Sequence, residues 1–331
     1  MKSRSLVLWA IIALVMGTLV GCGQTNSSAG SNGSDSAERG LTTVRVAYPQ
    51  GAATLPLRLG QTQGIFEKHG LKLAATEGVD FATYIASLGK QYDLSAASPG
   101  ILFPAMTKMP LVAVAGMQLN AANPKNSVLV TKDPSINSVK DLAGKRVGVA
   151  IVTGSNVQAL NYLLEAEGVD PKSVKYVQVG FAEQADQLRA GNVDAVVSAI
   201  PFWTVLEQAG NRIVLDVYVE ASKAATGREE SFNVAWIAQE SYANEHPEIL
   251  KSFKAALAES IEFMYNNESV AQAELVEWLG MDPELAKNAP VPSVSAEITK
   301  EQMEPMLVIA EAAGVVQNGA VNLDEAIWKE D

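Results

Sequence analysis

Cysteine and histidine are almost absent from this sequence. Its 331 residues include one cysteine, Cys22, and two histidines, His69 and His246. A single cysteine excludes an internal disulfide framework and a cluster of thiolate ligands. Both histidines fall at the ends of expected helices, next to Gly70 and Pro247, where side chains are usually exposed. Because a Ser-His-Asp triad or a His/Cys metal site has few possible members here, we expect no catalytic residues, no metal and no cofactor.

Positive charge is also scarce. The chain has 25 Lys and Arg against 37 Asp and Glu, a net charge of −12 and an isoelectric point near 4.8. This balance, with no Lys/Arg-rich stripe, excludes a nucleic-acid partner of the usual kind. It also gives an anionic ligand no long-range attraction. A hydrophobic content of 48% in a chain of this length is enough for two domains with sizeable cores.

Phosphate-loop motifs are missing as well. The turn Thr153-Gly154-Ser155-Asn156 separates a β-branched segment from an expected helix, but the G-x-x-x-x-G-K-[ST] frame is absent. No G-x-G-x-x-G follows a strand either. Two interpretations of the turn stay open. It either caps its own helix through Ser155 or Asn156, or it holds a small anion or polar group on free backbone N–H groups.

The one long apolar segment stands at the N-terminus. Lys2 and Arg4 precede the uncharged stretch 6–20, which is shorter than the roughly 20 residues of a membrane-spanning helix. It ends in Leu-Val-Gly-Cys at 19–22, which resembles a bacterial lipobox. We therefore expect residues 1–21 to be a lipoprotein signal peptide and residues 22–42 to be a lipidated Cys22 with a flexible tether rich in Gly, Ser and Asn. The mature protein would lie outside the cytoplasmic membrane, attached by this lipid anchor alone.

The rest of the chain alternates strand and helix patterns. One series starts at VRVAYP (44–49), and a second starts at RVGVAIV (146–152) and ends in an expected strand at 212–219. Such alternation predicts an α/β protein with mostly parallel sheets flanked by helices. The stretch 78–99 parallels 179–201, each with a Phe-Ala pair and a strand end with Ser and Pro. This echo indicates two similar lobes.

Candidate binding residues cluster at the ends of expected strands, where open α/β sheets bind ligands. The Ser-Pro-Gly turn at 98–100 follows one strand, and Phe202 and Trp203 follow another. Tyr48 ends the first strand, and Arg228 lies in a loop near the last one. Aromatic side chains at such positions either line a ligand site or belong to the core.

Several segments in order resemble the solute-binding lipoproteins of ABC importers, in the nitrate/sulfonate/taurine and thiamine-precursor group. They cover about residues 44 to 316 and include LPLRLGQTQGIFEKHGLKL, SVKDLAGKRVGV, GNVDAVVSAIP and ANEHPEILKSFKAAL. The resemblance implies the two-lobed type II periplasmic-binding-protein fold with two hinge crossings. Lobe 1 would comprise 43–131 and 236–331, and lobe 2 would comprise 132–235. By family practice and position, the expected ligand contacts are Tyr48, Gln50, Ser98, Gly100, Thr153, Gly154, Ser155, Asn156, Phe202, Trp203, Arg228 and Ser231.

The same resemblance implies a function without chemistry. A monomeric receptor would capture a small molecule between its lobes and deliver it to an ABC permease and its ATPase. We expect a small organic anion of the sulfonate, nitrate or taurine kind, held by local N–H groups and by Arg228. The alternative is a neutral heterocycle such as a thiamine pyrimidine precursor, stacked on aromatic residues. A more remote alternative is an enzyme of pyrimidine synthesis, which relies on a cysteine- and histidine-rich site, whereas this chain has no cysteine after Cys22 and only two histidines.

Overall fold

The computed structural model describes residues 40–78 and 81–330. The expected signal peptide and the lipidated Cys22 therefore lie outside the described residues. Strand β1 begins at Thr42, the last residue that was assigned to the tether. Among residues 40–78 and 81–330, no helix combines the length and the apolar character that crossing a bilayer requires.

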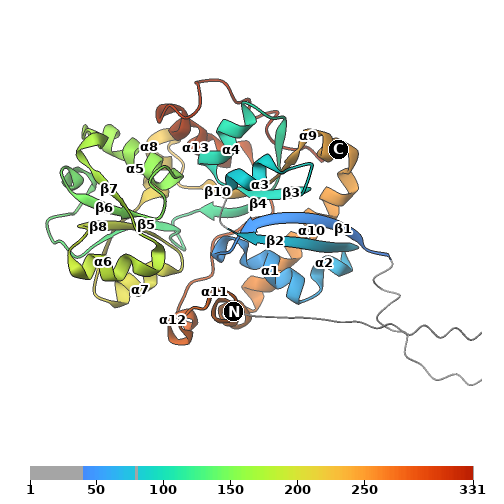
Figure 1. Cartoon of the computed structure of the whole chain (residues 1–331), viewed down its shortest axis with the longest axis horizontal. Coiled ribbons are helices and arrows are strands. Elements are labelled where there is room, and N and C mark those ends of the chain that lie inside the picture. The colour runs from blue at the N-terminus through green and yellow to red at the C-terminus, as the bar shows by residue number, and fades with distance from the viewer. Residues whose placement is uncertain (1–39, 79–80, 331) are drawn as a thin grey trace, which may run out of the picture. The chain divides into compact units, whose positions relative to one another are not determined.

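The first lobe is built on a five-stranded sheet of order β2-β1-β3-β10-β4. Strands β1, β2 and β3 are parallel, whereas β10 runs antiparallel to both β3 and β4. Helices cover both faces of this sheet (Figure 1). The strands are β1 (Thr42–Pro49), β2 (Leu71–Gly78), β3 (Leu94–Ala97), β4 (Leu111–Asn120) and β10 (Ser231–Gln239), and the helices are η2 (Ala52–Thr54), α1 (Leu55–Thr62), α2 (Ile65–Lys68), α3 (Phe81–Ala86), α4 (Pro99–Met106), α9 (Glu240–Glu245), α10 (Pro247–Asn266), α11 (Glu268–Leu279), α12 (Pro283–Lys287) and α13 (Lys300–Ala312).

The second lobe repeats this arrangement with a sheet of order β7-β6-β8-β5-β9. Strands β6, β7 and β8 are parallel, and β5 is antiparallel to β8 and β9. Figure 1 shows α5 and α8 on one face of the sheet and α6 and α7 on the other. The elements are β5 (Ser127–Thr131), η3 (Val139–Leu142), β6 (Arg146–Val149), α5 (Ser155–Ala166), η4 (Pro171–Ser173), β7 (Lys175–Gln178), η5 (Phe181–Glu183), α6 (Gln184–Ala190), β8 (Ala195–Ala199), α7 (Phe202–Gln208), β9 (Arg212–Asp216) and α8 (Val217–Thr226).

The lobe boundaries differ from those expected. Strand β5 pairs with β8 and β9 and so belongs to the second sheet, although residues 127–131 were assigned to the first lobe. Strand β10 begins at Ser231 and pairs with β3 and β4, although residues 231–235 were assigned to the second lobe. The two crossings are therefore the segments 121–126 and 227–230. A β-branched segment predicts a strand, but it carries no sign of which sheet will pair with it.

The end of the second lobe also differs from the prediction. Residues 212–219 were expected to form one strand, but β9 ends at Asp216 and helix α8 starts at Val217. The Asp216 side chain accepts hydrogen bonds from the backbone N–H groups of Tyr218 and Val219, as a helix N-cap does. This cap overrides the strand preference of the alternating β-branched and aromatic residues.

The same ion pair occurs once in each lobe. Arg45 on β1 donates backbone and guanidinium N–H groups to Asp93, which directly precedes β3. Arg146 on β6 does the same with Asp194, directly before β8, and both pairs span 48 residues. Each arginine also donates to a loop carbonyl oxygen. The shared strand order and this repeated pair confirm the internal echo of the sequence.

Asp93 is expected to contribute strongly to stability. It is buried, and it accepts from both the backbone and the side chain of Arg45. We expect Asp93→Ala to lower the free energy of unfolding by about 2 kcal/mol in chemical denaturation, because two donors lose a buried acceptor. The control is Asp186→Ala, which removes a surface pair with Arg189 on the same helix and should cost much less. Equal losses of unfolding free energy in the two variants would contradict a special contribution of Asp93 to stability.

The two lobes share part of one hydrophobic core. Phe103 of α4 and Met303 of α13 belong to the same buried cluster as Leu160 of α5 and Ala221 of α8. Separate clusters fill the opposite faces of the first and the second sheet. The lobes are therefore packed together along one side, formed by α4, α5, α8 and α13 (Figure 1).

Candidate ligand-binding site between the lobes

A cavity of about 270 Å³ lies where the two lobes meet. The first lobe contributes the starts of α3 and α4, and the second lobe contributes the loop between β6 and α5, η5 and the first turn of α8. The strand ends on this cavity are the carboxyl ends of β3 and β6, the position expected for ligands of open α/β sheets. The lining residues are Phe81, Ala82, Ser98, Gly100, Ile101, Ala150, Ile151, Thr153, Gly154, Ser155, Asn156, Phe181 and Tyr218.

Ser155 joins the lobes at the wall of the cavity. Its Oγ accepts a hydrogen bond of 3.0 Å from the backbone N–H of Gly100, across the boundary between the lobes. Tyr218 lines the same cavity. A Cβ added to Gly100 would meet Ser155 Oγ at 2.9 Å, so a larger residue there would displace the Ser155 hydroxyl from its hydrogen bond. The Oγ of Ser155 is thus an acceptor for the first lobe.

The turn opening α5 does not cap itself. The N-cap position is Gly154, and no side chain accepts a hydrogen bond there. The interpretation that Ser155 or Asn156 caps this helix is therefore wrong. The N-cap of α4, Ser98, also makes no side-chain cap hydrogen bond. In α4, Pro99 has no N–H group, Gly100 donates to Ser155, and Ile101 donates to the carbonyl oxygen of Ser98. In α5, the N–H groups of Ser155 and Asn156 are the first-turn donors that remain for a bound molecule at the cavity.

Asn156 has a fixed orientation. Its Oδ1 accepts a hydrogen bond of 2.9 Å from the hydroxyl of Ser127, the first residue of β5. This contact leaves the amide Nδ2 of Asn156 as the group that can donate to a bound molecule.

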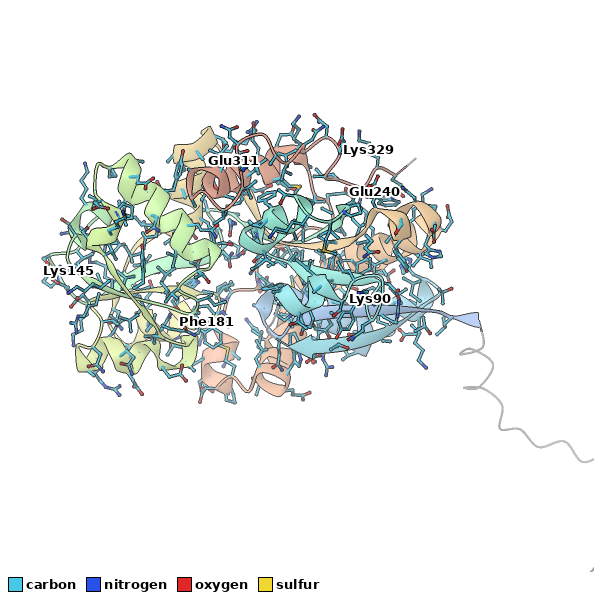
Figure 2. The ribbon with its side chains drawn as sticks, turned by 45° about the horizontal axis from the view of Figure 1, so that its top comes forward. Lys90, Lys145, Phe181, Glu240, Glu311 and Lys329 are labelled. Carbon is cyan, nitrogen blue, oxygen red and sulfur yellow. The ribbon has the colours of Figure 1, made fainter. Side chains whose placement is uncertain are left out.

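Aromatic and aliphatic side chains supply most of the remaining wall. Phe81 comes from the first lobe and Phe181 from the second, and Figure 2 labels Phe181 on the side of its lobe that faces the other lobe. Phe181 is stacked on Phe202, with ring centroids 5.4 Å apart and an interplanar angle of 12°. Ile151 also lines the cavity and is 56% exposed, an unusual exposure for a large aliphatic residue. A flat apolar molecule would cover these surfaces.

The cavity carries no formal charge. None of the described residues that line it is Asp, Glu, Lys, Arg or His. Burial raises the pKa of the Tyr218 phenol well above its usual value, so its hydroxyl stays neutral at physiological pH. The site therefore offers neutral donors and acceptors beside apolar rings.

The expected contact residues divide into two sets. Ser98, Gly100 and the turn Thr153 to Asn156 line the cavity as expected. Phe202 lies behind Phe181, and the indole N–H of Trp203 donates to the carbonyl oxygen of Lys125 in the first crossing. Neither of these two aromatic residues lines the cavity.

Tyr48 and Gln50 do not line the cavity. The Tyr48 ring is fully buried against Trp236, and its hydroxyl donates to Glu77 at 2.9 Å. The Gln50 amide donates to the carbonyl oxygen of Trp278. An aromatic residue at a strand end thus belongs to the core here.

Arg228 and Ser231 also lie away from the cavity. Arg228 forms an ion pair with Glu304 and lines a separate surface hollow with Glu301 and Gln302. Ser231 is fully buried at the start of β10 and is hydrogen-bonded to Asn120. The cation that was expected to hold an anion is therefore already neutralised elsewhere.

Three residues that line the cavity were not among the contacts expected from the sequence: Phe81, Phe181 and Tyr218. Phe81 and Phe181 stand at matching places in the internal echo, in the Phe-Ala pairs of 78–82 and 179–182, so the repeat itself was a signal for them. Tyr218 was not expected at the cavity because residues 212–219 were predicted to be one strand, whereas Tyr218 lies in the first turn of α8.

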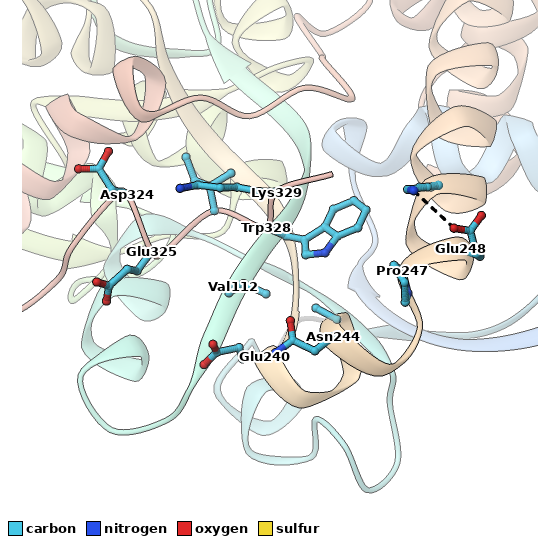
Figure 3. A pocket seen from close by; sticks show the side chains of 12 residues that line it. Val112, Glu240, Asn244, Pro247, Glu248, Asp324, Glu325, Trp328 and Lys329 are labelled. Atoms are coloured by element: carbon cyan, nitrogen blue, oxygen red, sulfur yellow. Dashed lines mark hydrogen bonds and ion pairs between the residues drawn. The ribbon is translucent and has the colours of Figure 1, made fainter. Parts of the chain in front are cut away.

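A larger hollow of about 610 Å³ lies on the first lobe (Figure 3). It is bordered by α9, the start of α10 and the C-terminal segment with Trp328, and Lys251 pairs there with Glu248. Every residue that lines it belongs to the first lobe, so relative movement of the lobes would not enclose a molecule there. Within residues 40–78 and 81–330, no group of three or more His, Cys, Asp or Glu is placed to hold a metal ion.

The fold and this cavity define the two-lobed periplasmic-binding-protein class. A solved structure with the same fold is the aliphatic sulphonate-binding protein SsuA of Escherichia coli, with a TM-score of 0.70, 17% identity and coverage of 86% of this chain and 97% of that one. The sequence profile of the NMT1/THI5-like family matches residues 52–271. The chain belongs to this family.

Two curated relatives are similar in sequence. One is the formylaminopyrimidine-binding protein of Halalkalibacterium halodurans, 28% identical over 267 residues, which are 78% of this chain and 75% of the relative. The other is a protein of Haemophilus influenzae named for thiamine biosynthesis, 32% identical over 143 residues. That match spans less than half of either protein, 43% of this chain and 44% of the relative.

Proposed function

We propose that this chain is the solute-binding receptor of an ABC importer and that its ligand is a small uncharged aromatic heterocycle. The cavity between the lobes carries the proposal: it has phenylalanines from both lobes and neutral polar groups, and none of its described lining residues is charged. Its volume of about 270 Å³ suits a single substituted ring. The similarity to a formylaminopyrimidine-binding protein supports a pyrimidine of the thiamine-precursor kind.

A small sulfonate is the second candidate ligand. It is favoured by the uncapped first turn of α5, whose N–H groups at Ser155 and Asn156 can donate hydrogen bonds to an anion. Against it stand the net charge of −12 and the pairing of Arg228 with Glu304. Without a cation at the cavity, the anion would lose its hydration for backbone hydrogen bonds alone.

Titration calorimetry separates the two candidates. We expect formylaminopyrimidine to bind the purified full chain with a dissociation constant at or below about 1 µM, corresponding to roughly −8 kcal/mol. Taurine and ethanesulfonate should give no heat beyond dilution. Binding of a sulfonate with silence from the pyrimidine would reverse the assignment, and silence from both would remove it. Mass spectrometry after prolonged incubation should return the pyrimidine unchanged, because the proposed function includes no chemical step.

Attachment by a lipid on Cys22 is part of the same proposal. It rests on the basic start, the apolar stretch and the Leu-Val-Gly-Cys ending of residues 1–22. We expect Cys22→Ser to move the protein from the membrane fraction to the soluble fraction of its host, as seen by immunoblotting. A variant at Thr25 in the same segment serves as the control and should remain with the membrane. Membrane retention of Cys22→Ser would contradict lipid anchoring.

A further inference from the structure

Buried polar side chains connect the two crossings between the lobes. At the start of the first crossing, Asn120 donates through Nδ2 to Ser231 Oγ at 3.0 Å, and Ser231 opens β10 after the second crossing. At the end of the first crossing, the Asn126 amide donates to Asn120 Oδ1 at 2.7 Å. Ser222 of α8 donates to the same Ser231 hydroxyl. All four residues are at most 3% exposed, so these hydrogen bonds are shielded from water.

Asp216 completes this connection. Its Oδ1 accepts from the N–H groups of Tyr218 and Val219 and so caps α8. Its Oδ2 accepts from the backbone N–H of Asn126 at 3.0 Å, the last residue of the first crossing. The carboxylate of Asp216 therefore binds both the end of the first crossing, where the chain enters the second lobe, and the start of α8, the last helix before the second crossing.

Both ends of this connection reach the cavity. Tyr218 lies two residues after Asp216 and lines the cavity. Ser127 follows Asn126 directly and fixes the amide of Asn156, another lining residue. A displacement of either crossing would thus move polar groups of the cavity wall.

The carboxylate is more than the helix cap requires. Asp216 is only 7% exposed, and its burial raises the pKa of its carboxyl group, so keeping it charged has a cost. A hydroxyl is sufficient for capping, as Thr299 shows at the start of α13. What the carboxylate adds is the second oxygen, and that oxygen is the one that reaches the first crossing.

We propose that Asp216 is a positioning residue for ligand binding, which sets Tyr218 and Asn156 at the cavity wall by tying the first crossing to α8. It touches no ligand itself. The expected change in affinity rests on the proposed function. The expected change in hydrogen exchange at the first crossing does not depend on it.

The test compares Asp216→Ser with Asp282→Ser in the full chain. Serine can still cap a helix, but its single oxygen cannot also reach Asn126. Asp282 caps α12 through the same two types of bond, to Glu284 and Leu285, and lies in the first lobe away from the crossings. Asp216→Asn keeps the volume of the carboxylate and replaces Asp216→Ser if that variant does not fold.

Two measurements are made on each variant: hydrogen–deuterium exchange, and calorimetric titration with formylaminopyrimidine well below the melting temperature. For Asp216→Ser we expect roughly ten-fold faster exchange confined to segment 121–127 and roughly ten-fold weaker binding, the loss typical of one hydrogen bond to a charged group. Asp282→Ser should match the wild type in both.

Faster exchange throughout the second lobe, unchanged exchange at 121–127, or local loosening with unchanged affinity would each overturn the proposal. If the wild-type chain binds no pyrimidine, the proposed ligand has failed. The titration is then repeated with the sulfonate that binds, while exchange at 121–127 still decides whether Asp216 holds the crossing.

Discussion

Replacing Gly100 by valine is expected to weaken binding of the ligand by about 10- to 100-fold, equivalent to ~1–3 kcal/mol of overpacking. A Cβ at this position would meet Ser155 Oγ at 2.9 Å and the Gln158 amide nitrogen at 3.0 Å. Both neighbours are side-chain atoms of the second lobe, so the valine side chain displaces Ser155 and Gln158 and pushes against that lobe. The hydrogen bond from Gly100 N–H to Ser155 Oγ would lengthen at the same time.

The control for this variant is Gly51→Val. Gly51 also lies in the first lobe, has an extended backbone with φ of 166°, and has no atom within 4 Å of an added Cβ. Its affinity and melting temperature should match the wild type. Small-angle scattering of Gly100→Val should show a larger radius of gyration than Gly51→Val. Unchanged scattering together with wild-type affinity would show that this approach of α4 and α5 does not matter for binding.

The second large effect is expected from the two phenylalanines. Phe81→Ala and Phe181→Ala should each lower affinity for the pyrimidine by about 30-fold, close to the ~2 kcal/mol typical of a buried aromatic anchor. The rings come from different lobes, so both effects require that one molecule contacts both. Val315→Ala, at a 40% exposed position that does not line the cavity, is the control and should leave affinity unchanged.

The double variant adds a stricter criterion. If both rings contact the same bound molecule, the loss in Phe81→Ala/Phe181→Ala should differ from the sum of the single losses, because the second truncation acts on a ligand already free to shift. Full affinity in either single variant would contradict a ligand held between the rings.

Much of this molecule was predictable from local sequence signals. Alternating strand and helix patterns gave the α/β class, and the echo between 78–99 and 179–201 corresponds to a real repeat with matching Arg45–Asp93 and Arg146–Asp194 pairs. The turn at 153–156 was located correctly because a change from β-branched to small polar residues is a strong local feature.

The errors arose where tertiary partners decide. Residues 212–219 have a strand pattern, but the Asp216 side chain ends β9 and caps α8, which places Tyr218 at the cavity. The sequence alone carries no sign of a partner for Arg228. In the structure Arg228 forms an ion pair with Glu304, which lies far along the chain. Tyr48 fits either a binding wall or a core, and its contact with Trp236 makes it core.

A crystal structure of the chain with bound formylaminopyrimidine tests the central claim most directly. The account predicts density for the ring between Phe81 and Phe181, with its polar edge toward the N–H groups opening α5 and the amide of Asn156. Density in the hollow beside Trp328, or contact with one lobe alone, would contradict it.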